Sequence, residues 1–243
     1  MDSIKVLVIA TSIQNIADSN YKAGIWLEEL ATPYYIFKAA GTSITMASPN
    51  GGLVPVDPRS QSIIVSTTRT KRFLNDVEAM DFLSHSIILK DVKDDDFDVA
   101  YLPGGHGPMW DLADNKILKQ LLERFYNAGK PIGAVCHGVV GLLSLQNDNG
   151  EFLVKGKNLT GFSNTEEAST GLAHVLPFLL ESRLAAIGAL YTKGEDYLSY
   201  MVTDGNIVTG QNPDSSGQVA KKIMELAENR KEASSQYKGS LIK

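Results

Sequence analysis

The chain has 243 residues, of which 43% are hydrophobic and 21% charged, and its formal net charge is −5. This composition is ordinary for a soluble globular protein, and the acidic balance without a basic cluster argues against a nucleic-acid-binding surface. A single cysteine excludes an intramolecular disulfide and favours a reducing cytoplasm, and no apolar stretch approaches the roughly 20 residues that cross a bilayer, so we expect no membrane partner.

Short apolar runs with strand character alternate with longer helical patterns. The expected strands are 5–10, 43–47, 99–102, 131–135, 158–160 and 207–209, and the expected helices are 23–40, 115–128, 137–145, 177–190 and 216–229. Apolar strands separated by helices predict an α/β fold with a doubly wound, mostly parallel sheet and helices on both faces. In such folds the binding site lies at the carboxyl ends of the strands.

No repeat or low-complexity linker divides the chain, so we expect one domain over residues 1–230. Residues 51–97 are richer in turns and charge, which predicts a hairpin or cap beside the sheet. Residues 231–243 are polar, and we expect them to form a flexible C-terminal tail.

The single cysteine lies in the segment Gly-Ala-Val-Cys-His-Gly-Val at 133–139. Cys136 follows a predicted strand and precedes a predicted helix, with Ala134 and Gly138 two residues away on either side. Small residues at these positions are what a nucleophile elbow requires. Because a helix N-terminus favours the thiolate, we expect a depressed pKa for Cys136. A buried structural cysteine is the alternative.

A glycine-rich loop ends the strand predicted at 99–102. Gly104 and Gly105 allow the backbone to approach a ligand closely and to present N–H groups to an anion. Together with the N–H of His137, this loop predicts an oxyanion hole. His106, in the same loop, is a candidate to contact substrate.

Three motifs, PGGHGPMWDL, AVCHG and GKNLTGFSNTEE, occur in an order that resembles the ThiJ/PfpI superfamily. The chain is most similar to the branch of glutathione-independent glyoxalases (glyoxalase III) and heat-shock chaperones. The resemblance implies a flavodoxin-like fold similar to class I glutamine amidotransferases, a 2-oxoaldehyde substrate such as methylglyoxal, no cofactor, and a homodimer. The alternatives are a deglycase that removes glyoxal adducts under stress, a holding chaperone, and an amidase- or peptidase-like hydrolase.

The resemblance also implies a glutamate beside the thiol, and helical periodicity selects between two neighbours. At ~100° per residue, Glu29 falls near ~40°, inside the apolar arc that holds Trp26 and Leu30, whereas Glu28 falls near ~300°, outside that arc. A carboxylate on an apolar face is costly unless its pKa rises or it finds partners. We therefore assign Glu29 as the general acid/base.

A second glutamate pair follows Ser163. Ser163 and Glu166 match a capping box, which gives Glu166 a structural role. Glu167 is then free to orient the imidazole of His137, in a Cys136–His137–Glu167 arrangement like the triad of the family. The alternative for Glu167 is an acidic residue favoured by the helix dipole. No local motif supports a metal site, and we expect no metal.

Overall fold

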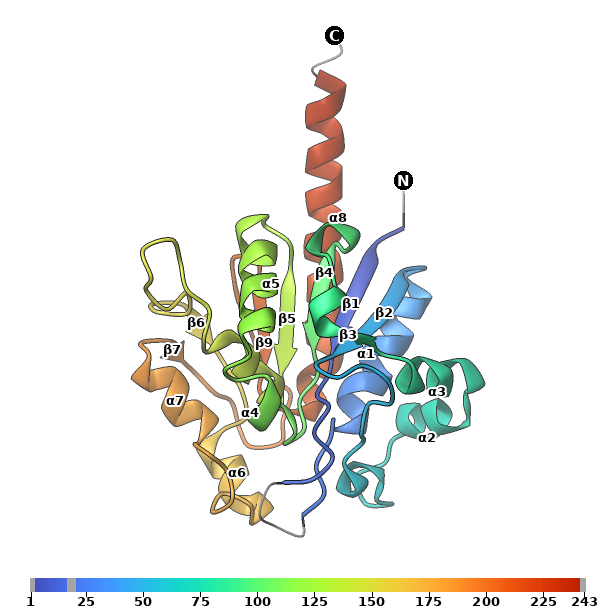
Figure 1. The fold of residues 1–243 in the computed structure, drawn as a ribbon, viewed down its shortest axis with the longest axis vertical. Coiled ribbons are helices and arrows are strands. Elements are labelled where there is room, and N and C mark those ends of the chain that lie inside the picture. Colours follow the sequence, from blue (N-terminus) through green and yellow to red (C-terminus); the bar gives the residue numbers. More distant parts are fainter. Residues whose placement is uncertain (1–2, 17–20, 241–243) are drawn as a thin grey trace.

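The chain forms an open sheet with helices packed on both of its faces (Figure 1). The structure is a computed structural model that describes residues 3–16 and 21–240, with side chains as far as residue 235. The strands are β1 (Lys5–Ile9), β2 (Ser43–Ser48), β3 (Ile87–Ile88), β4 (Val99–Leu102), β5 (Ile132–Val135), β6 (Asn158–Leu159), β7 (Leu190–Tyr191), β8 (Met201–Asp204) and β9 (Ile207–Gly210). The helices are α1 (Leu27–Ala39), α2 (Thr68–Asn75), α3 (Val77–Ser84), α4 (Pro108–Asp111), α5 (Lys116–Asn127), α6 (Asn164–Thr170), α7 (Leu180–Ala186) and α8 (Ser216–Ser240), with shorter 3-10 segments at Pro58–Gln61, Leu89–Asp91, Asp94–Asp96, Cys136–Leu142 and Pro213–Ser215.

The main sheet has the strand order β3-β2-β1-β4-β5-β9-β8. Its neighbouring strands are parallel except for the antiparallel pair β8–β9. The predicted α/β class and the mostly parallel sheet are therefore confirmed. The strand expected at 158–160 belongs instead to a separate pair, β6–β7. The direction of winding changes between β1 and β4, which is where a doubly wound sheet opens a crevice for a ligand.

The edge strand β8 was not among the predicted strands. Its residues are mostly half-buried or exposed, so it lacks the continuous apolar run of the inner strands. It joins β9 through the two-residue turn Gly205-Asn206, with Gly205 at φ 59°. A Gly-Asn pair between two short β-rich runs is a hairpin signal, so the local sequence did carry an indication of this strand.

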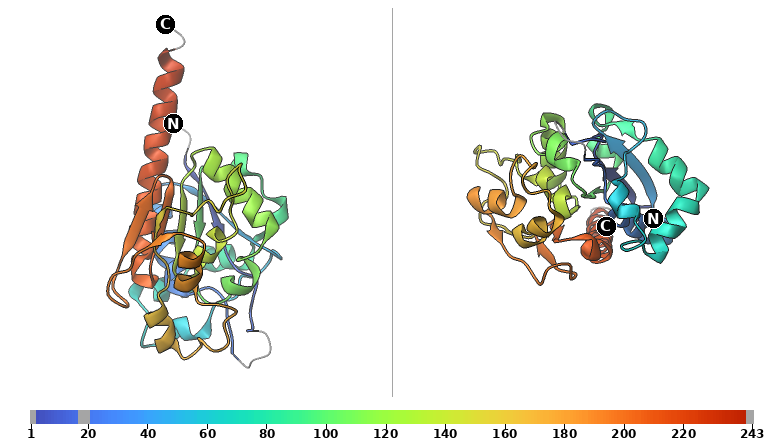
Figure 2. Two further views of the ribbon diagram at one scale, coloured as in Figure 1. Left: turned by 90° about the vertical axis from the view of Figure 1, so that its left-hand side faces the viewer. Right: turned by 90° about the horizontal axis from the view of Figure 1, so that it is seen from below.

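Helices α1 and α8 pack against each other on one face of the sheet, and α5 covers the other face (Figure 2). The helix expected at 137–145 is instead a 3-10 segment. The tail expected at 231–243 is helical as far as residue 240, because α8 continues to Ser240 and projects beyond the body of the protein (Figure 1). Its flexibility stays a prediction. The sequence there includes Lys, Glu, Ala and Gln, which are strong helix formers. Residues 241–243 lie outside the described residues.

The segment 51–97 forms helices α2 and α3 rather than a hairpin. The side chains of Thr67 and Asp76 cap the first N–H groups of these two helices, which accounts for where each one begins. Strand β3 then joins the main sheet in parallel with β2. The residues before α2 pass over the carboxyl edge of the sheet and contribute a wall of the cavity described below.

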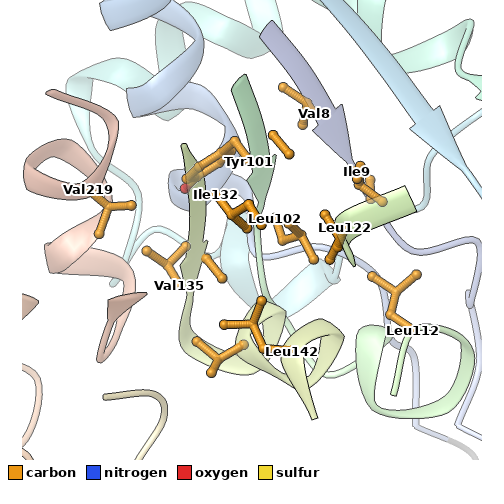
Figure 3. Close-up of a cluster of buried hydrophobic side chains, with 14 of the residues drawn as sticks. Val8, Ile9, Tyr101, Leu102, Leu112, Leu122, Ile132, Val135, Leu142 and Val219 are labelled. Carbon is orange, nitrogen blue, oxygen red and sulfur yellow. The ribbon is translucent and has the colours of Figure 1, made fainter. Parts of the chain in front are cut away.

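Fully buried side chains fill the space around β4 and β5 (Figure 3). They include Tyr101, Leu102, Ile132, Val135 and Leu142, none of which is exposed to solvent. Close packing on both faces fixes the ends of these two strands, from which the functional loops emerge. Within the described residues, no helix is long and apolar enough to cross a membrane.

Candidate active site

Cys136 lies on a sharp turn directly after β5. Its backbone has a positive φ of 54°, which is uncommon for a residue other than glycine. A Cβ at position 138 would lie 2.3 Å from the carbonyl oxygen of Leu102, so only glycine fits there. The sharp turn and the small neighbour that a nucleophile elbow requires are therefore present at Cys136.

A hydrogen-bonded chain connects the sulfur to a buried carboxylate. The Sγ of Cys136 is 3.3 Å from Nδ1 of His137, and Nε2 of His137 is 2.5 Å from Oε2 of Glu167. Glu166 is occupied by its capping box with Ser163, as the sequence predicted. The three residues assigned to a triad are thus within contact distance, and Glu167 is the acidic residue that orients the imidazole.

His106 contacts Glu167 from the other side. Its Nε2 is 2.9 Å from Oε1 of Glu167, and its Nδ1 is 3.0 Å from Nη2 of Arg59. Because a guanidinium only donates hydrogen bonds, Nδ1 of His106 accepts and Nε2 carries the proton that it donates to Glu167. Burial lowers the pKa of His106 to about 4, so the ring is neutral. Both ring nitrogens are therefore occupied, and His106 helps to hold Glu167. His106 also lines the cavity described below, so its contact with substrate stays a prediction.

Glu167 is ionised between these two imidazole rings. Burial opposes its charge, but hydrogen bonds from His106 and His137 hold its pKa well below the usual range. An ionised carboxylate requires a proton on Nε2 of His137. The lone pair of Nδ1 then faces the thiol of Cys136, as a base must.

Arg59 and Asp57, which were not predicted as site residues, complete this chain. Asp57 is fully buried and accepts hydrogen bonds from the backbone N–H and the guanidinium of Arg59. Asp57 therefore holds the guanidinium in the position from which it donates to His106. No local motif marks this pair, because the two residues lie in the segment 51–97, which approaches the site only in the folded chain.

Glu29 is fully buried beside the thiol, whereas Glu28 is half-buried. The helical phase therefore predicted the burial of the two residues correctly. The N–H of Gly104 donates to Oε2 of Glu29 at 2.6 Å, and the hydroxyl of Tyr101 donates to its backbone oxygen at 2.8 Å. That backbone oxygen is available because Pro33, four residues later, has no N–H to donate.

The carboxyl of Glu29 is neutral at pH 7. Burial raises its pKa to about 8, although the hydrogen bond from Gly104 opposes this shift. Its Oε1 has no hydrogen-bond partner among the described residues. A neutral carboxyl in this position can donate a proton to a reacting atom and can later take one back.

The expected depression of the Cys136 pKa is wrong. Complete burial raises the pKa of the thiol, and a charge on Glu29 would raise it further, while the N–H groups of Gly105 and His137 oppose both effects. The helix that was expected to favour the thiolate is a short 3-10 segment. The free site therefore contains a thiol and a carboxylic acid at neutral pH.

Two of the predicted oxyanion donors lie close to the sulfur of Cys136. The N–H groups of Gly105 and His137 lower the pKa of the Cys136 thiol, against the larger effect of burial. Gly104 differs from the prediction, because its N–H is bound to Glu29 and is not available to substrate. A Cβ on Gly104 would lie 2.7 Å from the backbone nitrogen of His137, so glycine is required for this close approach.

Some of the groups described above lie at a cavity of about 500 Å³. Cys136, His137 and Gly105 lie in its wall. The remaining lining residues come from several parts of the chain and are Trp26, Glu28, Arg59, Val65, Thr67, His106, Phe162, Thr170, Tyr197, Asn212, Pro213 and Asp214.

His106, His137 and Glu167 bring nitrogen and oxygen atoms within 4.8 Å of one another, a spacing that a metal ion could bridge. In the structure, each carboxylate oxygen of Glu167 instead accepts a hydrogen bond from one of the two rings. A metal would have to displace both of these protons. The hydrogen-bonded arrangement accounts for the three side chains without one.

Comparisons with known proteins show the family of the chain. Residues 22–226 match the DJ-1/PfpI family, which confirms the resemblance seen in the motifs. Rapid Encystment Protein 24 KDa of Francisella tularensis is 36% identical with a TM-score of 0.87, over 92% of this chain and 99% of that one. Glyoxalase III of Candida albicans is 28% identical with a TM-score of 0.84, over 92% and 97%. The glutathione-independent glyoxalase HSP31 of Saccharomyces cerevisiae is 28% identical over 93% and 98% of the two chains.

The neutral state of Glu29 predicts how the stability of the protein depends on pH. A carboxyl whose pKa rises on folding stabilises the folded state most below the unfolded value of 4.5, and this contribution is lost as the pH rises toward about 8. Over that window the free energy of unfolding of the wild type should fall, relative to Glu29→Gln, by about 1.4 kcal/mol per pH unit. Urea unfolding at pH 5, 6, 7 and 8 measures this difference.

Glu28→Gln is the matched control, since it removes a partly exposed carboxylate one residue earlier in α1. A constant difference between wild type and Glu29→Gln across the pH range would show that Glu29 is ionised in the folded protein.

Proposed function

The chain belongs to the DJ-1/PfpI family, and we propose that it is a glutathione-independent glyoxalase, which converts a 2-oxoaldehyde such as methylglyoxal to the 2-hydroxy acid. The observation that carries this proposal is a neutral, buried Glu29 carboxyl beside the thiol of Cys136. An enzyme that moves a proton between two adjacent carbons needs one acid/base group that can gain and lose a proton near pH 7. The relatives named as glyoxalases favour this activity over the chaperone and hydrolase alternatives.

In the first step the sulfur of Cys136 adds to the aldehyde carbon. His137 takes the thiol proton through Nδ1, which faces the sulfur. The oxygen that gains charge is stabilised by the N–H groups of Gly105 and His137. Glu29 then protonates this oxygen, which gives the neutral hemithioacetal and leaves Glu29 as a carboxylate.

In the second step the Glu29 carboxylate removes the hydrogen from the former aldehyde carbon. An enediol forms as His137 returns its proton to the ketone oxygen. Glu29 delivers its proton to the second carbon and takes the remaining hydroxyl proton, so that it ends neutral as it began. The first carbon is oxidised to a thioester and the second is reduced to an alcohol, so no external oxidant or cofactor is needed.

Hydrolysis of the thioester then releases the 2-hydroxy acid and regenerates the thiol. The thiol of Cys136 thus supplies what glutathione supplies in a two-enzyme route. Glu167 stabilises the His137 imidazolium that forms during addition, because it is ionised and only 2.5 Å away.

Replacing the nucleophile should abolish the reaction. We expect Cys136→Ser to form no lactate from methylglyoxal in the absence of glutathione, because a serine hydroxyl is a far weaker nucleophile than a thiol. The measurement is a coupled lactate assay, with circular dichroism to verify that the variant is folded. Activity within a few-fold of the wild type would eliminate the cysteine mechanism.

The two neighbouring glutamates should differ sharply in their effect. Glu29→Gln cannot transfer a proton and should lose about 10²–10⁴-fold in kcat, the usual contribution of a general acid–base group. Glu28→Gln should retain most of the activity, because Glu28 accepts hydrogen bonds from Thr32 and Thr67 at the edge of the cavity. The same lactate assay ranks the two variants, and the opposite order would refute the assignment of Glu29.

We also propose that the chain forms a homodimer, as its resemblance to the family implies. Light scattering should then give about twice the chain mass of 26.4 kDa. A mass near that of one chain at working concentration would contradict a dimer.

A further inference from the structure

A row of aromatic rings leads from the nucleophile to the mouth of the cavity. The ring of His137 lies 4.6 Å from that of Phe162, which lies 6.5 Å from the ring of Tyr197 in an edge-on arrangement. Trp26 also lines the cavity, and its backbone N–H donates to the carbonyl oxygen of Gly104 at 3.1 Å. Trp26, Phe162 and Tyr197 all line the cavity, and we call these three residues the aromatic wall; the ring of Phe162 is the one that contacts His137.

Tyr197 is held in an unfavourable backbone conformation. Its φ is 60°, a genuine outlier for a bulky side chain. The backbone N–H of Tyr197 donates to Oε1 of the fully buried Glu166 at 2.8 Å, and Nδ2 of Asn212 donates to the same oxygen at 2.9 Å. The surrounding structure thus fixes a ring that is itself 47% exposed. Strain retained at the rim of a binding cavity points to a function for the side chain.

The cavity is much larger than methylglyoxal requires. Five non-hydrogen atoms occupy on the order of 150 Å³ at about 30 Å³ per water-sized group, against about 500 Å³ available. A three-carbon substrate bound to Cys136 would leave the aromatic wall uncovered. A larger substituent on the ketone carbon would reach it.

The charged groups of the cavity do not favour an ionic substituent. The Arg59 guanidinium is bound to Asp57 and His106, and the Glu28 carboxylate accepts hydrogen bonds from Thr32 and Thr67. Asp214 lies at the exposed rim. Among the other lining residues, the aromatic wall offers an apolar surface that suits an apolar ring.

We propose that this site takes 2-oxoaldehydes with an aromatic substituent in place of the methyl group, and that the aromatic wall binds this ring. The proposal rests on the glyoxalase function proposed above. For phenylglyoxal, the reaction is the addition of one water to give mandelic acid, with the aldehyde carbon oxidised and the ketone carbon reduced as in methylglyoxal. Phe162, in contact with His137, lies closest to the reacting carbons, and Tyr197 covers the outer part of the ring.

The test compares kcat/KM for phenylglyoxal and methylglyoxal, without glutathione, in four proteins. The wild type should prefer phenylglyoxal by about tenfold or more, since burying a few extra apolar groups is worth that much in specificity. Tyr197→Gly removes the ring without straining the positive φ, and it should lower the phenylglyoxal-to-methylglyoxal ratio about tenfold. Tyr197→Phe keeps the ring and should stay within about twofold of the wild-type ratio.

Leu198→Ala is the matched control, because Leu198 is the adjacent residue, 55% exposed, and does not line the cavity. It should leave the ratio unchanged. If the phenylglyoxal-to-methylglyoxal ratio is the same in wild type and Tyr197→Gly and methylglyoxal is still converted, the aromatic site is overturned. The proposed glyoxalase function is then unaffected. Failure of the wild type to form a hydroxy acid from either substrate would overturn the glyoxalase function and this proposal together.

Discussion

The hydrogen bond from the N–H of Gly104 to the Glu29 carboxyl fixes a fully buried acid beside the thiol of Cys136. Everything else in the site depends on this contact. Position 104 must be glycine for its backbone to come close enough to donate to Glu29. Pro33, which has no N–H, leaves the backbone oxygen of Glu29 free to accept from Tyr101. The end of β4 sets the position of the loop that carries Gly104. The energetic cost of burying a carboxyl is what makes Glu29 neutral and hence able to donate a proton.

The second carboxyl of the site has the opposite character. Glu167 is also buried, yet two imidazole N–H groups hold it ionised, whereas Glu29 has the single N–H of Gly104 and remains neutral. Because their pKa values differ, the two carboxyls have distinct roles. Glu29 can donate and accept a proton, whereas Glu167 stabilises a cation on His137. His106 and its anchor Arg59 serve this separation, because His106 donates one of the hydrogen bonds that Glu167 accepts and Arg59 holds the His106 ring.

Sequence patterns predicted the inner strands, the main helices and the elbow, because buried parallel strands and nucleophile turns impose strict local rules. Helical phase was enough to choose the buried glutamate at position 29. The role of His106, the anchor Arg59 and the strained Tyr197 depend on contacts between segments far apart in the chain, which no local pattern encodes. The pKa of Cys136 was misjudged for the same reason, since it is set by burial and by Glu29 rather than by its own turn.

The central claim is that the Glu29 carboxyl is neutral at pH 7 in the folded protein, and its direct measurement is a carbon-13 NMR titration of the glutamate side-chain carboxyls. Glu29→Gln identifies the resonance by its disappearance. The structure predicts a midpoint near pH 8 for that resonance, well above the unperturbed value of 4.5. A midpoint near 4.5 would show a carboxylate beside the thiol at neutral pH and would contradict the proposed proton transfer.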